Sequence, residues 1–113
     1  MAIVSPVPVA PTDAFAALAC PTRRGLFEHL VRGGEQNVRA LTARAGVSQP
    51  AVSKHLAVLT RAGLVCARPE GRQTFYSARP SGLKPVADWL EGYAAFWDER
   101  LDRLEGLLNR REP

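Results

Sequence analysis

The stretch from Ala40 to Leu64 constrains the fold of this chain more than any other part of its sequence. Two helical patterns meet there at Gly46, and glycine readily supplies the positive φ that a sharp turn between helices requires. In the second pattern, Val52, Leu56 and Leu59 are spaced i, i+4 and i+7, so they share one face of a helix. The sequence therefore predicts two helices joined by a tight turn, the second packing its apolar face on the rest of the domain.

A basic hairpin pattern follows this pair of helices directly. Residues 64–68 and 73–78 are predicted to be strands, and residues 69–72, which include Gly71 and Arg72, form the turn between them. Two helices with a tight turn, followed by such a hairpin, are typical of a winged helix-turn-helix domain, in which the hairpin is the wing.

The flanking segments are predicted to be helical, and each predicted helix except the last follows a capping residue or has proline in its first turn. The expected order is ααααββα, a mainly α fold with a small β-wing, in one domain of residues 12–110. Three prolines within residues 5–11 predict a flexible arm over residues 1–11. The predicted helices cover residues 12–19, 21–33, 38–45, 49–62 and 82–108.

Composition narrows the class of protein. The 113 residues carry a net charge of +4, an excess that is compatible with binding to a polyanion but does not establish it. No apolar run approaches the roughly 20 residues of a membrane span, and residues 1–14 lack the basic and apolar parts of a signal peptide. We therefore expect a cytoplasmic protein without membrane contact, in which a structural disulfide between its two cysteines is not the default.

The fourth predicted helix has the features of a helix that reads DNA. A major groove about 12 Å wide admits one α-helix, whose N-terminal side chains reach the bases. With the apolar face turned inward, Gln49, Ser53 and Lys54 point outward, and these residue types hydrogen-bond to bases or phosphates. The basic turn of the hairpin is expected to follow the backbone or enter the minor groove. The candidate DNA-binding residues are Ser48, Gln49, Pro50, Ala51, Ser53, Lys54, His55, Arg68, Arg72 and Gln73.

The segment SQPAVSKHLAVLTRAGLV, residues 48–65, resembles the corresponding part of the ArsR/SmtB family of winged-helix repressors, and the resemblance extends over residues 13–108. The aromatic-rich last helix is similar to that of a branch without metal sites. The resemblance implies a homodimer that blocks transcription by occupying an inverted-repeat operator in double-stranded DNA. No cofactor is expected. It also implies a dimer interface made by the first and last helices. The candidate interface residues are Phe15, Leu18, Leu90, Tyr93, Trp97, Leu101, Leu104 and Leu108.

Metal sensing by the family's common routes is not expected. The third predicted helix has no cysteine and the last has no histidine, so both usual ligand sets are missing. Cys20 precedes Pro21 at the positive end of the second helix, where a thiolate is favoured. Cys20 and Cys66 are thus candidates for a redox or metalloid response. The alternatives are two inert thiols, an unidentified small-molecule inducer, or no inducer.

Two other classes of function fit the sequence less well. A winged domain can serve as a protein–protein interaction module without DNA, and the sequence leaves that alternative open. An enzyme is not expected, because no Ser/His/Asp order, phosphate-binding loop, metal triad or clustered carboxylate pair occurs. The operator, the regulated genes and the choice between repression and activation are not readable from the motifs.

Overall fold

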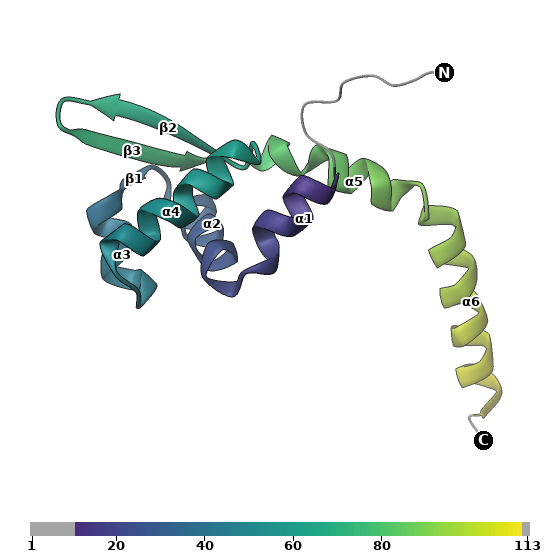
Figure 1. Cartoon of the computed structure of the whole chain (residues 1–113). Helices are drawn as coiled ribbons and strands as arrows, with labels where there is room; N and C mark the ends of the chain where they lie inside the picture. The colour runs from purple at the N-terminus through teal and green to yellow at the C-terminus, as the bar shows by residue number, and fades with distance from the viewer. Residues whose placement is uncertain (1–10, 112–113) are drawn as a thin grey trace, which may run out of the picture.

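The structure, a computed structural model, describes residues 11–111. Its helices and strands follow one another as a helical domain, a hairpin and a helical extension (Figure 1). Most of the arm predicted for residues 1–11 lies outside the described residues, but Pro11 already belongs to the first helix. The elements are α1 (Pro11–Ala19), α2 (Pro21–Gly33), β1 (Gln36–Asn37), α3 (Val38–Ala45), α4 (Gln49–Arg61), β2 (Val65–Glu70), β3 (Gln73–Ala78), the 3-10 helix η1 (Pro80–Leu83), α5 (Lys84–Glu91) and α6 (Ala94–Arg111).

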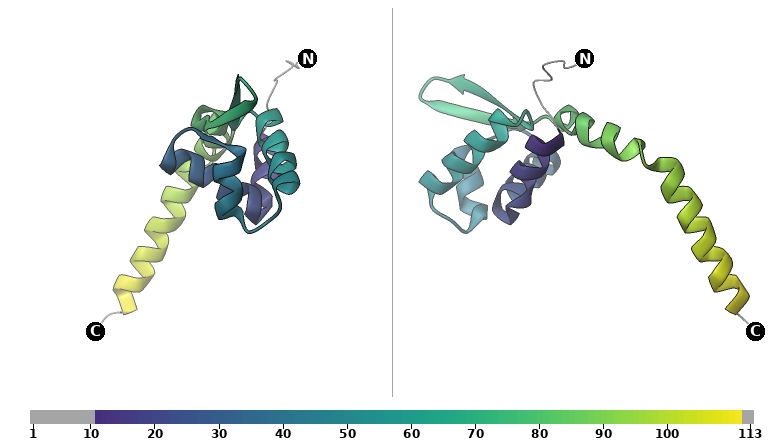
Figure 2. Two further views of the ribbon diagram at one scale, coloured as in Figure 1. Left: turned by 90° about the vertical axis from the view of Figure 1, so that its left-hand side faces the viewer. Right: turned by 45° about the vertical axis from the view of Figure 1, so that its right-hand side comes forward.

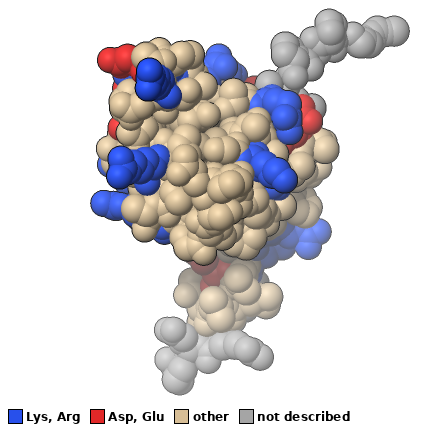
Figure 3. All heavy atoms as spheres, turned by 60° about the vertical axis from the view of Figure 1, so that its left-hand side comes forward, with Lys and Arg blue, Asp and Glu red and all other residues tan. Residues whose placement is uncertain are grey.

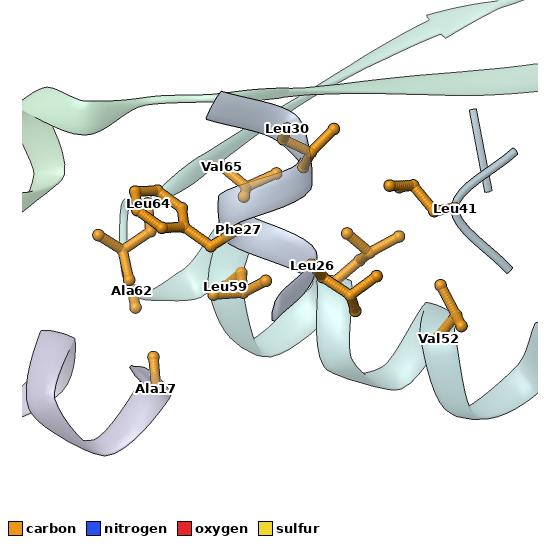
Figure 4. Packing of buried hydrophobic residues seen from close by; sticks show 11 residues of the cluster. Ala17, Leu26, Phe27, Leu30, Leu41, Val52, Leu59, Ala62, Leu64 and Val65 are labelled. Carbon is orange, nitrogen blue, oxygen red and sulfur yellow. The ribbon is translucent and has the colours of Figure 1, made fainter. Parts of the chain in front are cut away.

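The core lies between α2, α3, α4 and the start of β2 (Figure 4). The predicted apolar face of α4 is confirmed, because Val52, Leu56 and Leu59 are fully buried. Leu26 from α2 and Leu41 from α3 pack into the same cluster. Each such side chain contributes about 1.5–3 kcal/mol when it leaves water. This cluster fixes α4 on the domain and determines which of its residues face outward.

The three strands form one antiparallel sheet in the order β1-β3-β2. The hairpin register runs from Val65 opposite Ala78 to Glu70 opposite Gln73. Gly71 begins the two-residue turn with φ of 63°, as type II′ hairpin turns require. The sheet extends away from the helices as a wing (Figures 1 and 2), so the predicted winged helix-turn-helix architecture is confirmed.

The sheet differs from the sequence prediction in its strands. The strand β1 was not predicted, because two residues are too short for an alternating pattern and pair only with a distant strand. Strand β2 continues beyond the predicted end at Arg68 to Glu70, since an edge strand tolerates Pro69, which lacks an N–H group. The element order therefore differs from ααααββα at β1 and at the last helix.

The last helix, predicted to be continuous, is broken into three parts. The chain forms η1 first, then α5, and then α6 after a break at residues 92–93. Gly92 has the lowest helix propensity after proline and offers no side chain to cover the junction. In consequence α5 stays against α1, whereas α6 extends away from the domain at the end opposite the wing (Figures 1 and 2).

Candidate nucleic-acid interface

The turn between α3 and α4 sets the position of the outward face of α4. Gly46 ends α3 in the left-handed region with φ of 71°, which confirms the predicted turn residue. Ser48 then caps α4, with its Oγ atom accepting a hydrogen bond of 3.3 Å from the backbone N–H of Ala51. Ser48 is exposed, but its hydroxyl serves as the cap of α4, so the polar side chains without a capping role begin with Gln49.

The first two turns of α4 present the predicted reading residues to solvent. Gln49, Pro50, Ser53 and Lys54 are exposed, and Ala51 and His55 are half-buried. No acidic side chain occurs in the first turn of α4, and the N-terminal end of a helix attracts anions. This end of α4 is therefore suited to approach a negatively charged backbone.

A cleft of about 420 Å³ lies between α3, α4 and the wing. It brings together two predicted residues of α4, Gln49 and Ser53, with two predicted residues of the wing, Arg72 and Gln73. Helix α4 and the wing thus line one concave surface. Side chains suited to contact base edges therefore lie beside side chains suited to contact the phosphate backbone of the same DNA. Its remaining lining residues are Asn37, Val38, Arg39, Thr74 and Tyr76.

Sequence reasoning missed the contribution of β1 and α3 to this cleft. Asn37 and Arg39 lie there because β1 pairs with β3, with Asn37 opposite Phe75. Arg39 is an exposed cation beside the predicted set. The sequence did contain one signal for Arg39: it lies in the first turn of α3, the helix that immediately precedes α4.

Arg68 is held by two carboxylates on the face of the wing. Its Nε and Nη2 atoms donate to the two carboxylate oxygens of Glu35 at 3.0 and 2.8 Å, and Nη1 donates to Glu70. Its guanidinium also lies 5.1 Å from the centre of the Phe75 ring. The hydrogen bonds from Arg68 hold the pKa of the Glu35 carboxyl below its usual range, although partial burial opposes the shift. Arg68 therefore fastens the loop before β1 to the wing.

The charge of this end of the molecule is distributed rather than concentrated. Figure 3 shows Lys and Arg side chains spread around a largely uncharged surface, with few acidic groups. Scattered cations beside polar side chains suit contacts to individual phosphates, with uncharged groups left to meet base edges.

Comparison with known proteins identifies the family. Residues 18–65 match the model described as "Helix-turn-helix domain". The chain is 41% identical over 99 residues to the HTH-type transcriptional regulator Rv2034 of Mycobacterium tuberculosis, covering 88% of this chain and 89% of that protein. The chain is also similar to the solved structure of an ArsR-like transcriptional regulator from Rhodococcus sp. RHA1, with 34% identity and a TM-score of 0.68, over 86% of this chain and 91% of that chain. This chain belongs to the ArsR family of transcriptional regulators.

A second solved structure supports the same assignment. The crystal structure of a possible transcriptional regulator for arsenical resistance is 41% identical to this chain, with a TM-score of 0.66, and the match covers 83% of this chain and 94% of that chain. As an ArsR-family member the chain is a DNA-binding transcriptional regulator. The family assignment decides against the alternative of an interaction module without DNA, and places the chain in a family of regulators rather than enzymes.

The two cysteines of this ArsR-family chain lie on different elements. Cys20 is half-buried at the N-cap of α2, and Cys66 is exposed on β2; both are free thiols. Cys20 makes no regular capping hydrogen bond through its sulfur. The pKa of its thiol is nevertheless lowered, mainly by hydrogen bonding to the backbone N–H of Arg23 and to a smaller extent by Thr22 and the Arg23 guanidinium. Burial of the thiol opposes this shift. Among residues 11–111, no three His, Cys, Asp or Glu side chains are grouped as metal ligands would be.

An aromatic face on α1, α5 and the break at residues 92–93 contains part of the predicted dimer interface. Phe15 contacts Trp89 edge to face, with ring centres 5.5 Å apart, and Trp89 contacts Tyr93 in the same way at 5.1 Å. These rings and Leu90 are each nearly half exposed. Leu18 packs instead on the core of its own domain. The other predicted interface residues, from Trp97 to Leu108, lie on α6.

Proposed function

We propose that the chain is a homodimeric repressor that binds an inverted-repeat operator through α4 and the wing. The observation that supports this most directly is the shared cleft of Gln49, Ser53, Arg72 and Gln73. In this arrangement α4 enters the major groove, where Gln49, Ser53 and Lys54 meet base edges. Arg72 and Arg39 lie where they can bind the backbone on either side.

The exposed aromatic face on α1 and α5 supports the homodimer. Phe15, Trp89, Leu90 and Tyr93 form a contiguous apolar surface that a monomer would leave in water. A two-fold axis beside this face would place the two α4 helices on successive major grooves, about one helical turn apart. None of the described helices is long and apolar enough to cross a membrane, and we place the regulator in the cytoplasm, where its DNA is.

The reading face is tested with a pair of double variants. Ser53→Glu/Lys54→Glu puts acidic groups on the exposed side of α4, whereas Ser81→Glu/Lys84→Glu makes the same chemical changes at exposed positions on η1 and α5. Binding is measured by fluorescence anisotropy on a duplex from the promoter region of the protein's own gene, at fixed salt. We expect the first variant to lose at least about 100-fold in affinity, because several phosphate and base contacts become repulsive. The control should bind within a few-fold of the parent.

Tight binding retained by the Ser53→Glu/Lys54→Glu variant would exclude α4 as the reading helix. Equal loss in both variants would show that net charge, rather than a specific face, determines binding. Circular dichroism of both variants establishes that each remains folded.

A further inference from the structure

One face of the wing carries side chains that connect the two edges of its sheet. Arg68 lies on β2, which is one edge strand, and Glu35 directly precedes β1, which is the other. The Nε and Nη2 atoms of Arg68 donate to the two carboxylate oxygens of Glu35 at 3.0 and 2.8 Å. The bridge between these two side chains therefore crosses the central strand β3.

Phe75 of β3 lies beneath this bridge. It is directly opposite Arg68 in the pairing of β2 with β3, and the side chains of directly opposite residues share one face of a sheet. The guanidinium of Arg68 accordingly lies 5.1 Å from the centre of the Phe75 ring. A planar cation that binds one carboxylate with two hydrogen bonds and lies over an aromatic ring is held in one orientation. We refer to Glu35, Arg68 and Phe75 as the wing brace.

The wing brace lies on the outer face of the wing. Side chains alternate between the two faces of a strand, and Tyr76, the residue after Phe75, packs on the core of the domain. Phe75 and Arg68 therefore point to the other face. Arg68 is also not among the described residues that line the cleft, whereas Arg72 is. The brace thus holds the wing from the side opposite the domain and lies outside the cleft.

The charges around Arg68 do not favour a phosphate contact. Its Nε, Nη1 and Nη2 atoms each donate to a carboxylate, two to Glu35 and one to Glu70. The two carboxylates outweigh the one guanidinium, so the group as a whole is anionic. A phosphate would have to displace a carboxylate from charge-assisted hydrogen bonds. Contact between the wing and the DNA backbone is therefore left to Arg72, which lines the cleft.

The other attachments of the wing to the domain extend over few residues. Val65 at the start of β2 is buried in the core, but the rest of the hairpin is exposed or half-buried, and β1 adds only two residues of pairing. A two-stranded hairpin is marginally stable by itself, so its angle depends on the side chains that hold it. The turn beside Arg72 and Gln73 lies at the free end of the wing, where a change in that angle has its largest effect (Figure 1).

We propose that Glu35 and Arg68 are positioning residues for DNA binding, and that their bridge holds the wing at the angle at which Arg72 faces the same DNA as Gln49. The proposal rests on the proposed function and gives Arg68 a role other than the DNA contact that the sequence predicts. Single exposed ion pairs contribute little, whereas bidentate pairs within a network contribute more. One consequence is specific to this role: an acidic side chain close to the DNA-binding surface strengthens the binding of DNA.

The sign of the effect of Glu35 on DNA affinity tests the proposal. Glu35→Gln removes one negative charge and disrupts the bridge, whereas Glu28→Gln, its matched control, removes the same charge from an exposed position on α2. Binding is measured by fluorescence anisotropy on the promoter duplex, at fixed salt. We expect Glu35→Gln to bind about threefold to fivefold more weakly than the parent. The control should bind equally well or slightly more tightly, because loss of a negative charge favours a polyanion. Equal or tighter binding by Glu35→Gln overturns the proposal.

A double-mutant cycle separates positioning from direct contact. If Arg68 acts through Glu35, then Glu35→Gln, Arg68→Gln and the double variant should lose about the same affinity, because each disrupts the same bridge. If Arg68 instead contacted a phosphate, Arg68→Gln would bind DNA more weakly and Glu35→Gln, which frees the guanidinium, more tightly. Additive effects of opposite sign would therefore refute the positioning role.

Amide hydrogen exchange without DNA distinguishes a displaced wing from a destabilised domain. In Glu35→Gln, exchange should become several-fold faster in residues 67–77 and remain unchanged in α2 and α4. Faster exchange in every element would mean that the bridge only stabilises the fold, and unchanged exchange in the wing would mean that the bridge does not hold it. A parent chain that binds no duplex refutes the proposed function itself. A parent that binds, with Glu35→Gln behaving like the control, refutes only the positioning role.

Discussion

Asn37, the residue that precedes α3, is joined to the wing by a hydrogen bond of 2.7 Å from its Nδ2 atom to Oε1 of Gln73. The same side chain caps α3, because its Oδ1 atom accepts a hydrogen bond of 2.9 Å from the backbone N–H of Ala40. One amide therefore sets both where α3 begins and where the turn of the wing lies. Since Gln73 lines the cleft with Gln49, this bond affects the distance between the two DNA-contacting elements.

Two substitutions at Asn37 separate its roles. Asn37→Ala removes both hydrogen bonds and should cost about 1 kcal/mol of unfolding free energy through the lost cap. Asn37→Ser retains a capping oxygen but cannot reach Gln73, so its stability should stay within about 0.5 kcal/mol of the parent. Both should bind DNA several-fold more weakly. Urea unfolding and anisotropy titration check the two effects, and full DNA affinity in Asn37→Ser would show that the wing needs no tether.

Gln49 and Arg72 are predicted to contribute differently to DNA binding. Gln49→Ala should change the preferred base at one position of each half-site, with a discrimination loss of about 1–3 kcal/mol. Arg72→Ala should weaken binding to all sequences alike and lower the salt slope of log K by about 1 for each phosphate that it no longer neutralises. The measurement is binding to a set of single-base operator variants at several salt concentrations. A sequence-dependent effect of Arg72→Ala would mean that the wing reads bases.

The pH dependence of stability should depend partly on Glu35. Its pKa is lowered in the folded state by hydrogen bonding to Arg68, so it binds fewer protons folded than unfolded near its ordinary pKa of about 4.3. Its stabilising effect is therefore complete above that value and is lost as the pH falls through the lower, folded pKa. Urea unfolding at a series of pH values from neutral downward through the ordinary pKa of about 4.3 should show a decline in stability that Glu35→Gln reduces. Identical pH profiles for parent and variant would exclude the contribution.

Local signals in the sequence predicted much of this fold, whereas contacts between distant residues were not predictable. The caps Asn37 and Ser48 and the turn glycine Gly46 act within a few residues of themselves, so propensity and spacing identify them. Arg68 shows the limit. It was predicted to contact DNA as a basic residue of the wing, but its partner Glu35 lies 33 positions earlier, and only the folded chain brings them together.

The last helix and the extent of the cleft were missed for different reasons. A heptad-like apolar pattern continues across Gly92, so periodicity gives no reason to break the helix there, and the low helix propensity of one glycine does not by itself locate a break. Arg39 joins the cleft because β1 pairs with β3, a contact between distant residues that no local pattern contains.

Two glycines should respond to alanine in opposite directions. A Cβ atom at Gly82 would lie 2.1 Å from the backbone oxygen of Gly63, so Gly82→Ala must shift the contact between η1 and the end of α4. We expect a loss of about 1–3 kcal/mol. Gly25 lies within α2, where an added methyl group would meet nothing within 4 Å, and Gly25→Ala should stabilise by about 0.5–1 kcal/mol. Thermal unfolding of both variants measures these changes in stability. A Gly82→Ala variant as stable as the parent would contradict the close approach of Gly82 to the backbone oxygen of Gly63.

The thiol of Cys20 should ionise at lower pH in the folded chain than in the unfolded chain. The N–H of Arg23 at the positive end of α2 is the main cause of its lowered pKa, and this field disappears when the helix unfolds. The Cys66→Ser variant leaves Cys20 as the only thiol. The rate at which iodoacetamide alkylates Cys20 is measured as a function of pH, with and without urea. The midpoint of this pH dependence should lie at lower pH in the folded protein than in the unfolded protein. Because the midpoint and not the absolute rate is compared, the half-burial of Cys20 does not obscure the result. Coinciding midpoints would show that the helix end leaves the thiol unactivated, and would remove the physical basis for a thiol-based response at Cys20.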